Sequence, residues 1–315
     1  MGKGQGAIVL LIIVGLVALL LFLSPQLFKA GPTTAPIVYK NDIISLENFE
    51  VSNLRPTEGS KLTISFDLLN NGDKTVDYAI IDFGGTTNSG NIKIVECEGG
   101  IEQTEDRLKR ILKIIPIPFT SEVTRLCIFE NIESLDTRKI VAEYTAPDPF
   151  SARIEVKVTY PYKGSREALI PIVDDKTVRT PQVKFRQSQP SFGPFAVDIV
   201  PPTKGWAIGN QPFELAFKLR FVGSTAVGTP IEPLDKLKLE KGKFTVTLEG
   251  LKVVSCPQLT NIDMVVNKEY SCNVQATGAI GTFGYKLGIV KIDFIYNYGF
   301  VRSQTITIRP APPSK

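Results

Sequence analysis

Apolar and polar residues alternate one by one along several stretches of the sequence, and this pattern constrains the fold most strongly. In Lys61–Leu69 every second residue is apolar, and the same alternation occurs in Ile154–Tyr160, Phe213–Phe221 and Phe244–Leu248. Successive side chains of a β-strand point to opposite faces, so a period of two predicts strands with one buried and one solvent-facing side. Many short strands without helices between them are typical of a β-sandwich and not of a parallel α/β fold. We therefore predict a mainly β protein.

The second half of the sequence repeats the first, which predicts two similar domains. Four positions of the first half have counterparts in the second, where Gly59, Phe66, Gly72 and Val76 correspond to Gly209, Phe217, Gly223 and Val227. Near the end of each half, Lys157–Tyr162 parallels Lys291–Tyr296. Each of these segments is followed by a predicted turn, at Lys163–Ser165 and Asn297–Gly299, and by a predicted final strand, at Ala168–Val173 and Gln304–Arg309.

These patterns divide the chain into segments. We predict a transmembrane anchor at 1–28, a linker at 29–40, a first β-sandwich domain at 41–175, a second linker at 176–194, a second β-sandwich domain at 195–309 and a tail at 310–315. Both linkers contain prolines, as expected of extended connections. The predicted architecture is therefore an N-terminal transmembrane helix followed by two tandem β-sandwiches.

An apolar run near the N-terminus predicts the anchor. Ala7–Leu23 contains seventeen residues without a charged or amide side chain. As a helix this run is roughly 26 Å long, close to the hydrocarbon thickness of a bilayer, about 30 Å. Ser24-Pro25 favours the end of the helix, because proline restricts the preceding residue to extended conformations. The simplest interpretation is an uncleaved signal anchor that binds the membrane through residues 7–23, with the N-terminus in the cytoplasm.

The residues before the apolar run resemble a known class of signal sequence. The segment Gly2–Ala7, GKGQGA, is similar to the class III signal peptide of archaeal type IV pilins. The resemblance implies a processing site at Lys3, Gly4 and Gln5, where a prepilin peptidase cuts after Gly4, and self-association of the N-terminal helix in a filament core. Many such pilins carry Glu at the fifth mature position, where this chain has Val9, and the globular part is large for a pilin. A plain anchor is therefore the leading hypothesis, and a pilin-like filament subunit is the alternative.

Four cysteines indicate the compartment of the body. Cys97 and Cys127 lie in the first predicted domain, and Cys256 and Cys272 lie in the second. Four cysteines allow three pairings, and we predict one disulfide within each domain because the domains should fold independently. A zinc site with four thiolates is disfavoured, since the sequence has no C-x-x-C pair.

Disulfides persist in oxidising compartments, and this fixes the predicted topology. We predict a single-pass protein of the plasma membrane with a cytoplasmic N-terminus and an extracytoplasmic body. The alternative is a cytosolic body with two pairs of reduced thiols.

The composition excludes several function classes. The chain has no histidine among its 315 residues, which rules out histidine-dependent triads and histidine metal sites. Ser165 and Ser191 therefore have no histidine to activate them. A net charge of +4 is too weak to predict a nucleic-acid partner. No carboxylate pair, metal-ligand spacing or cofactor motif stands out, so we predict no catalytic, metal or cofactor site and expect that the protein is not an enzyme.

A second resemblance lies in the first predicted domain, in Phe49–Phe83. Its carrying residues are Pro56 and Gly59 before the predicted strand, Leu62, Ile64 and Phe66 within it, and Asn70, Asn71 and Gly72 after it. The segment resembles the opening of a CARDB-type immunoglobulin-like adhesion domain. Such domains usually serve as adhesive modules or spacers in archaeal and bacterial surface proteins. The resemblance therefore implies two immunoglobulin-like β-sandwiches in an archaeal-type surface protein with an adhesive or structural role. It implies an envelope or surface protein as partner, without catalysis, and names no ligand.

Overall fold

The computed structural model describes the chain from Asn41 to Pro312 with several gaps. The described ranges are 41–83, 92–100, 126–146, 151–174, 183–224, 227–231, 238–239, 244–256, 264–280 and 284–312. Within them the chain forms strands, turns and bends, with no helix, and residues 39–315 belong to one compact unit. The prediction of a mainly β protein is therefore confirmed. The predicted helix within residues 1–28 lies outside the described residues.

Two of the described strands are far longer than the others. β7 and β18 each have 23 residues, whereas the next longest strand, β2, has 10. The strands are β1 (Ile44–Val51), β2 (Lys61–Asn70), β3 (Val76–Asp82), β4 (Ile92–Cys97), β5 (Leu126–Ile132), β6 (Thr137–Thr145), β7 (Ser151–Val173), β8 (Arg186–Gln187), β9 (Phe195–Val200), β10 (Ala207–Ile208), β11 (Phe213–Phe221), β12 (Thr229–Pro230), β13 (Lys238–Leu239), β14 (Phe244–Glu249), β15 (Leu251–Ser255), β16 (Met264–Val265), β17 (Glu269–Ala276) and β18 (Tyr285–Thr307).

The described strands form four sheets, in which every strand pair is antiparallel except that of β10 with β7. One four-stranded sheet has the order β1-β2-β6-β4, and the other has the order β15-β17-β11-β9. An eight-stranded sheet has the order β12-β18-β7-β3-β5, with β8 and β10 added at β7 and β14 added at β18. A small sheet of two strands consists of β13 and β16.

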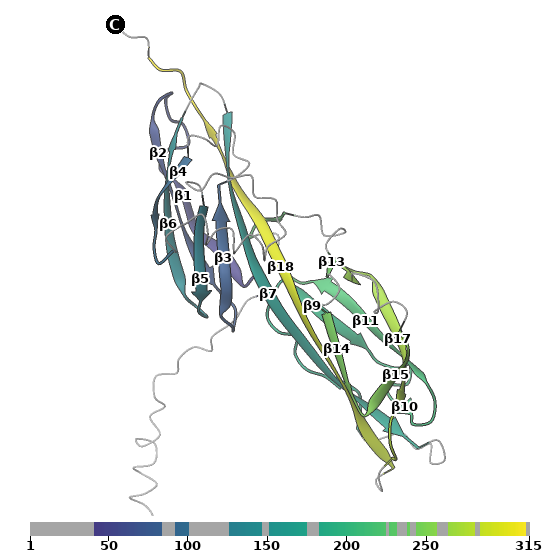
Figure 1. Cartoon of the computed structure of the whole chain (residues 1–315). Coiled ribbons are helices and arrows are strands. Elements are labelled where there is room, and N and C mark those ends of the chain that lie inside the picture. The colour runs from purple at the N-terminus through teal and green to yellow at the C-terminus, as the bar shows by residue number, and fades with distance from the viewer. Residues whose placement is uncertain are drawn as a thin grey trace, which may run out of the picture. The chain divides into compact units, whose positions relative to one another are not determined.

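The two long strands, β7 and β18, form an uninterrupted antiparallel pair. Ser151 opposes Thr307 at one end and Val173 opposes Tyr285 at the other, without a shift of register. Figure 1 shows β7 and β18 side by side along their length. β7 also pairs with β3 near its start and with β8 and β10 near its end. The two long strands therefore run through the whole length of the eight-stranded sheet and have different neighbours at their two ends.

One face of this long pair is buried, because both four-stranded sheets pack against it. The even-numbered residues are buried in β7 from Ala152 to Ile172 and in β18 from Gly288 to Phe300. This is the period of two that a strand with one buried face requires. The apolar side chains of all three large sheets belong to one continuous core.

The packing of sheet on sheet gives two parts, which we call the first stack and the second stack. In the first stack the sheet β1-β2-β6-β4 covers the eight-stranded sheet, and the ring centroids of Phe66 on β2 and Phe83 after β3 are 5.9 Å apart. In the second stack the sheet β15-β17-β11-β9 covers the eight-stranded sheet, and the ring centroids of Phe195 on β9 and Tyr296 on β18 are 4.9 Å apart. The middle of the long pair, where Tyr162 opposes Tyr296, is the waist between the stacks.

Two predicted turns are wrong, because the structure places both inside the long strands. Lys163–Ser165 lies within β7 and Asn297–Gly299 lies within β18, so the strands continue where a turn was expected. A Cβ on Gly164 would lie 2.1 Å from Cζ of Phe294, the residue directly opposite on β18. Glycine in the interior of a strand often marks such a close approach. Here it makes room for an aromatic ring and does not reverse the chain.

A buried asparagine joins two turns of the first stack at the end of β2. The Asn70 side chain is fully buried, and its Nδ2 donates to the carbonyl oxygens of Lys74, Ile132 and Glu133 at 2.9, 2.9 and 3.0 Å. Its Oδ1 accepts a hydrogen bond from the Gly72 amide at 2.9 Å. One side chain therefore satisfies four backbone groups of the turns that follow β2 and β5.

The predicted division into two domains, with its boundaries, stays a prediction. The predicted linker 176–194 contains β8, whose residues pair with Ala168 and Leu169 of β7. Beyond β18 the chain remains in contact with the first stack, because the Arg309 amide donates to the carbonyl oxygen of Pro56 at 2.8 Å. Both stacks therefore share strands as well as a core.

Candidate functional site

The first disulfide joins the two sheets of the first stack. Cys97, the last residue of β4, is bonded to Cys127 of β5, and their Cα atoms are 6.1 Å apart. β4 is an edge strand of its sheet, and β5 ends the order of the eight-stranded sheet on this side. The bond thus fastens the two sheets to each other at their edges. In the chain-entropy model, closing a loop with a sequence separation of 30 stabilises the fold by roughly 4 kcal/mol.

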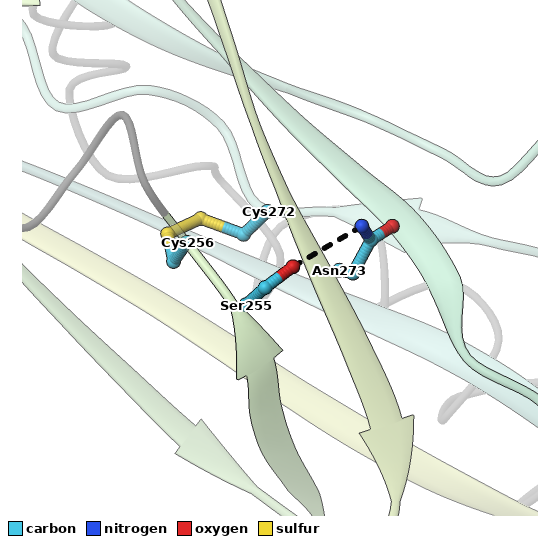
Figure 2. Close-up of a disulfide and its surroundings, with 4 residues drawn as sticks. All are labelled: Ser255, Cys256, Cys272 and Asn273. Atoms are coloured by element: carbon cyan, nitrogen blue, oxygen red, sulfur yellow. Dashed lines mark hydrogen bonds between the residues drawn. A yellow bond between two sulfur atoms is a disulfide. The ribbon is translucent and has the colours of Figure 1, made fainter.

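The second disulfide lies within a single sheet of the second stack. Cys256 directly follows β15 and is bonded to Cys272 of the neighbouring strand β17, with Cα atoms 4.3 Å apart. Ser255 opposes Asn273, so the two cysteines occupy the next opposed position. Figure 2 shows the disulfide beside the hydrogen bond from Asn273 Nδ2 to Ser255 Oγ, which is 3.3 Å long. The bond ties the edge strand β15 to its sheet and stabilises by roughly 3 kcal/mol in the same model.

Both predicted cysteine pairings are therefore confirmed, and the described residues contain no free cysteine. The predicted processing residues Lys3, Gly4 and Gln5 and the predicted anchor at 7–23 lie outside the described residues. In the described ranges no helix is long and apolar enough to span a membrane. The same ranges hold no group of three or more His, Cys, Asp or Glu residues placed to bind a metal ion.

Buried aromatic rings fill the waist. Tyr160 packs edge to face on Tyr298 at 5.8 Å between ring centroids, and Tyr162 packs on Phe294 at 5.6 Å. Phe195 of the facing sheet lies 5.7 Å from Tyr298. Such pairs contribute about 0.5–1.5 kcal/mol each beyond the burial of their area. Because these rings are buried, they stabilise the junction of the stacks.

Ser191 is a hydrogen-bond partner of a buried tyrosine. Its Oγ lies 3.0 Å from the Tyr162 hydroxyl and accepts a hydrogen bond from the Ser165 amide at 2.9 Å. Burial raises the pKa of Tyr162 to about 12, against the opposing effect of its hydrogen bond with Ser191. Tyr162 and Ser191 are 29 residues apart, so no local pattern in the sequence pairs them.

A small pocket lies at the surface of the waist. Lys74, Asp77, Tyr162, Lys163 and Phe192 contribute to its lining, and its volume is about 40 Å³. A water molecule needs about 10–15 Å³, so the pocket has room for a few waters. Lys163 Nζ and Asp77 Oδ2 are 2.6 Å apart, with more than half of each side chain exposed. Exposed ion pairs contribute about 0–1 kcal/mol, so neither the size nor the charge of the pocket indicates a ligand.

Three of the four edges of the four-stranded sheets carry a register shift. The shifts begin after Glu47 in β1, after Ile94 in β4 and after Val253 in β15. Bulges twist an edge strand and interrupt its row of unpaired backbone groups, which disfavours pairing with a strand of another chain. The body is therefore protected against edge-to-edge association at these strands.

The comparisons with known proteins show no family. No family model matches the chain, and no curated protein matches it. Among solved structures, Escherichia coli alpha-2-macroglobulin activated by porcine elastase is 11% identical, with 87% of this chain and 23% of that chain covered and a TM-score of 0.21. Salmonella alpha-2-macroglobulin reacted with methylamine is also 11% identical, with 87% and 17% covered and a TM-score of 0.21.

A third solved structure is matched over its whole length. The C-terminal domain of the Streptococcus pyogenes antigen I/II-family protein AspA is 8% identical, with 85% of this chain and 100% of that chain covered and a TM-score of 0.24. The chain spans less than a quarter of the macroglobulins it matches. TM-scores this low carry no argument, so a proposal about function has to come from the chain's own residues.

Proposed function

We propose that the protein is a membrane-anchored extracytoplasmic β protein with a structural or adhesive role at the cell surface. The observation that carries the proposal is the pair of disulfides, Cys97–Cys127 and Cys256–Cys272, one in each stack. Disulfides form and persist in oxidising compartments, which favours a body outside the plasma membrane. The apolar run at 7–23 supplies the anchor in this proposal, with the N-terminus in the cytoplasm.

The structural or adhesive role rests on how the described residues are used. The aromatic side chains of the waist are buried, and the described pocket at the waist has about 40 Å³, whereas pockets for small-molecule ligands have about 300–1,000 Å³. The bulged edges favour a body that does not pair with its own copies through β-strands. A partner in this proposal is an envelope or surface protein, and no catalysis is assigned to the chain.

Labelling of intact cells tests the proposed location. Lys61 and Lys163 have side chains that are 71% and 57% exposed, so a membrane-impermeant amine reagent should modify both when the body lies outside the cell. We expect the modified peptides in the membrane fraction of intact cells, and a cytosolic protein of the same cells, left unlabelled, serves as the control. Modification that requires permeabilised cells, or four free thiols in non-reducing peptide mapping, would contradict the proposal.

The second candidate function is a type IV pilin-like filament subunit whose N-terminal helix forms the filament core. The observation that favours it is the sequence Lys3-Gly4-Gln5 directly before the apolar run. A plain anchor predicts a native chain that begins at Met1 or Gly2, whereas processing predicts one that begins at Gln5. Mass spectrometry of the native N-terminus separates the two functions.

A substitution at the cleavage position provides a second test of the two candidates. A plain anchor needs only apolarity, so Gly4→Leu should leave the mass, the membrane fractionation and the surface exposure unchanged. A processed subunit needs a small residue at the cut, so Gly4→Leu should abolish trimming and surface filaments, while Gly4→Ala should retain them. Trimming of the wild type that Gly4→Leu prevents would replace the anchor proposal with the filament proposal.

A further inference from the structure

The first described residues are Asn41, Asp42 and Ile43, and the last two contact the first stack at the turn that contains Asn71 and Gly72. The Ile43 carbonyl oxygen accepts a hydrogen bond from the Asn71 amide at 2.5 Å, and the Asp42 carbonyl oxygen lies 3.4 Å from Asn71 Nδ2. The Ile43 side chain is only 6% exposed. A Cβ on Gly72 would lie 2.9 Å from Cγ2 of Ile43, so the glycine leaves room for this side chain.

Two of these residues, Asn41 and Asp42, also contact the second stack. Asp42 Oδ1 accepts a hydrogen bond from the Ser224 amide at 2.8 Å, and Asn41 Nδ2 lies 3.4 Å from the carbonyl oxygen of Val222. A Cβ on Gly223 would lie 2.9 Å from Asp42 Oδ1, so a glycine again leaves room, here for the carboxylate. These contacts join residues more than 180 positions apart in the sequence.

The segment Val222–Ser224, which contacts Asn41 and Asp42, is itself hydrogen-bonded within the second stack. The amides of Val222 and Gly223 both donate to the carbonyl oxygen of Pro194, at 2.8 and 3.2 Å. Pro194 directly precedes β9, and Phe221 directly precedes this segment at the end of β11. The contact with Asp42 therefore reaches two strands of the sheet β15-β17-β11-β9.

Asp42 also lies near the buried aromatic residues of the waist. Tyr298 is 3% exposed, and burial first and the Asp42 carboxylate second raise its pKa above the ordinary value. The three residues thus cover the junction of the two stacks directly after the segment 1–40.

We propose that Asn41, Asp42 and Ile43 form a clasp that fastens the N-terminal segment to both stacks at the waist. Without the contacts to the second stack, a pull on residue 41 would act on β1 alone and open it from the pair Ile44–Asn70. With the clasp, the same pull has to separate Asp42 from Ser224 as well, so two stacks share the load. The assumption that such a pull occurs rests on the proposed function, because tension arises only where residues 1–40 are held by a membrane or a filament.

Hydrogen exchange tests the clasp in the full-length protein in detergent micelles. Asp42→Ala removes the acceptor of the Ser224 amide. We expect this amide to exchange at least about tenfold faster, since the loss of one hydrogen bond to a carboxylate lowers the protection of the amide by about that factor or more. Gly223→Ala crowds the carboxylate from the other side and should have the same effect. Protection of β1 should remain, because its pairing with β2 is untouched.

A matched control changes the same side chain within one stack. Asp67 Oδ2 accepts a hydrogen bond from Asn48 Nδ2 at 2.6 Å, so Asp67→Ala removes a carboxylate acceptor that does not bridge the stacks. It should leave the exchange of the Ser224 amide unchanged. An unchanged Ser224 amide in Asp42→Ala, or an equal acceleration in Asp67→Ala, would overturn the clasp.

Single-molecule pulling from the two chain ends tests the load-bearing step. We expect the first rupture of the body to occur at a lower force in Asp42→Ala than in the wild type or Asp67→Ala. An equal rupture force in all three proteins would overturn it. Neither measurement depends on where the protein resides, so the clasp can fail while the proposed location holds, and the location can fail while the clasp holds.

Discussion

Replacing Asn70 by aspartate measures how far the first stack depends on one buried amide. The substitution keeps the shape of the side chain but exchanges Nδ2, which donates to three carbonyl oxygens, for an oxygen that repels them. Because Nδ2 carries two hydrogens, which the three carbonyl oxygens share, the lost donors at about 1 kcal/mol each predict a loss of about 2 kcal/mol in the free energy of unfolding. Ionisation of a carboxylate at a fully buried position adds to this loss, so we expect at least about 4 kcal/mol at neutral pH.

The pH dependence of this loss separates charge from missing hydrogen bonds. Burial and the neighbouring carbonyl oxygens favour the protonated acid, so the pKa of the new carboxyl group in the folded protein lies above the value of about 3.9 in an unfolded chain. The folded state of Asn70→Asp then binds a proton more tightly than the unfolded state. Its stability relative to the wild type should therefore recover as the pH falls from neutral towards about 4. Asn70→Ala also removes the acceptor of the Gly72 amide and introduces no charge, so its loss of about 3 kcal/mol should not change over this range.

Urea unfolding with intact disulfides, followed by circular dichroism, provides the measurement. Asn273→Asp serves as the matched control, because the Asn273 side chain is exposed and bonded to Ser255 at 3.3 Å. This control should shift the free energy of unfolding by no more than about 0.5 kcal/mol. A loss below about 1 kcal/mol in Asn70→Asp at neutral pH, or a large loss that does not vary with pH, would refute the reasoning.

Three further predictions concern the long strand pair. Gly164→Ala should cost about 1–3 kcal/mol in urea unfolding, because its Cβ would lie 2.1 Å from the Phe294 ring, and a second change, Phe294→Leu, should recover part of the loss. The pKa of the Tyr162 hydroxyl is about 12 in the folded protein and 10.0 in the unfolded chain, so the free energy of unfolding should fall by about 3 kcal/mol as the pH rises through this window. In alkaline urea titrations Tyr162→Phe should show a shallower fall than the wild type, and an equal slope would contradict the assignment. The fragment 41–175 lacks β18 and should fail to give the sharp, dispersed amide spectrum of a folded domain; a folded fragment would instead support independent domains.

The strand pattern could be predicted because alternation is a local signal. The stretch Phe213–Phe221 is β11 to the residue, and Lys61–Leu69 differs from β2 by one residue at its end. In both strands the apolar residues face the core, so the period of two was enough to place them. The disulfide pairing was also predictable, since two cysteines fall in each of the two predicted domains.

The continuation of β7 and β18 through two predicted turns, and the contacts of the waist, could not be predicted, because distant residues decide them. Gly164 has the local character of a turn residue, yet its strand continues because Phe294, 130 residues later, occupies the space above it. The role of Asn70 also depends on distant residues, because the carbonyl groups it satisfies include those of Ile132 and Glu133, more than 60 residues away. The contact of Asp42 with Ser224 has no local signal at all.

The length of the β7–β18 pair determines the order in which the chain can fold. The partners at one end are residues 173 and 285, and at the other end they are residues 151 and 307, so every contact of the pair is long-range. Such pairing is slow, because the entropy of closing the loop between the partners is lost before their contacts can offset it. A chain made from its N-terminus presents one whole edge of β7 until β18 emerges, and an unpaired edge of 23 residues invites aggregation. The body is therefore expected to remain incomplete during synthesis, and to fold as a whole once its last described strand is in place.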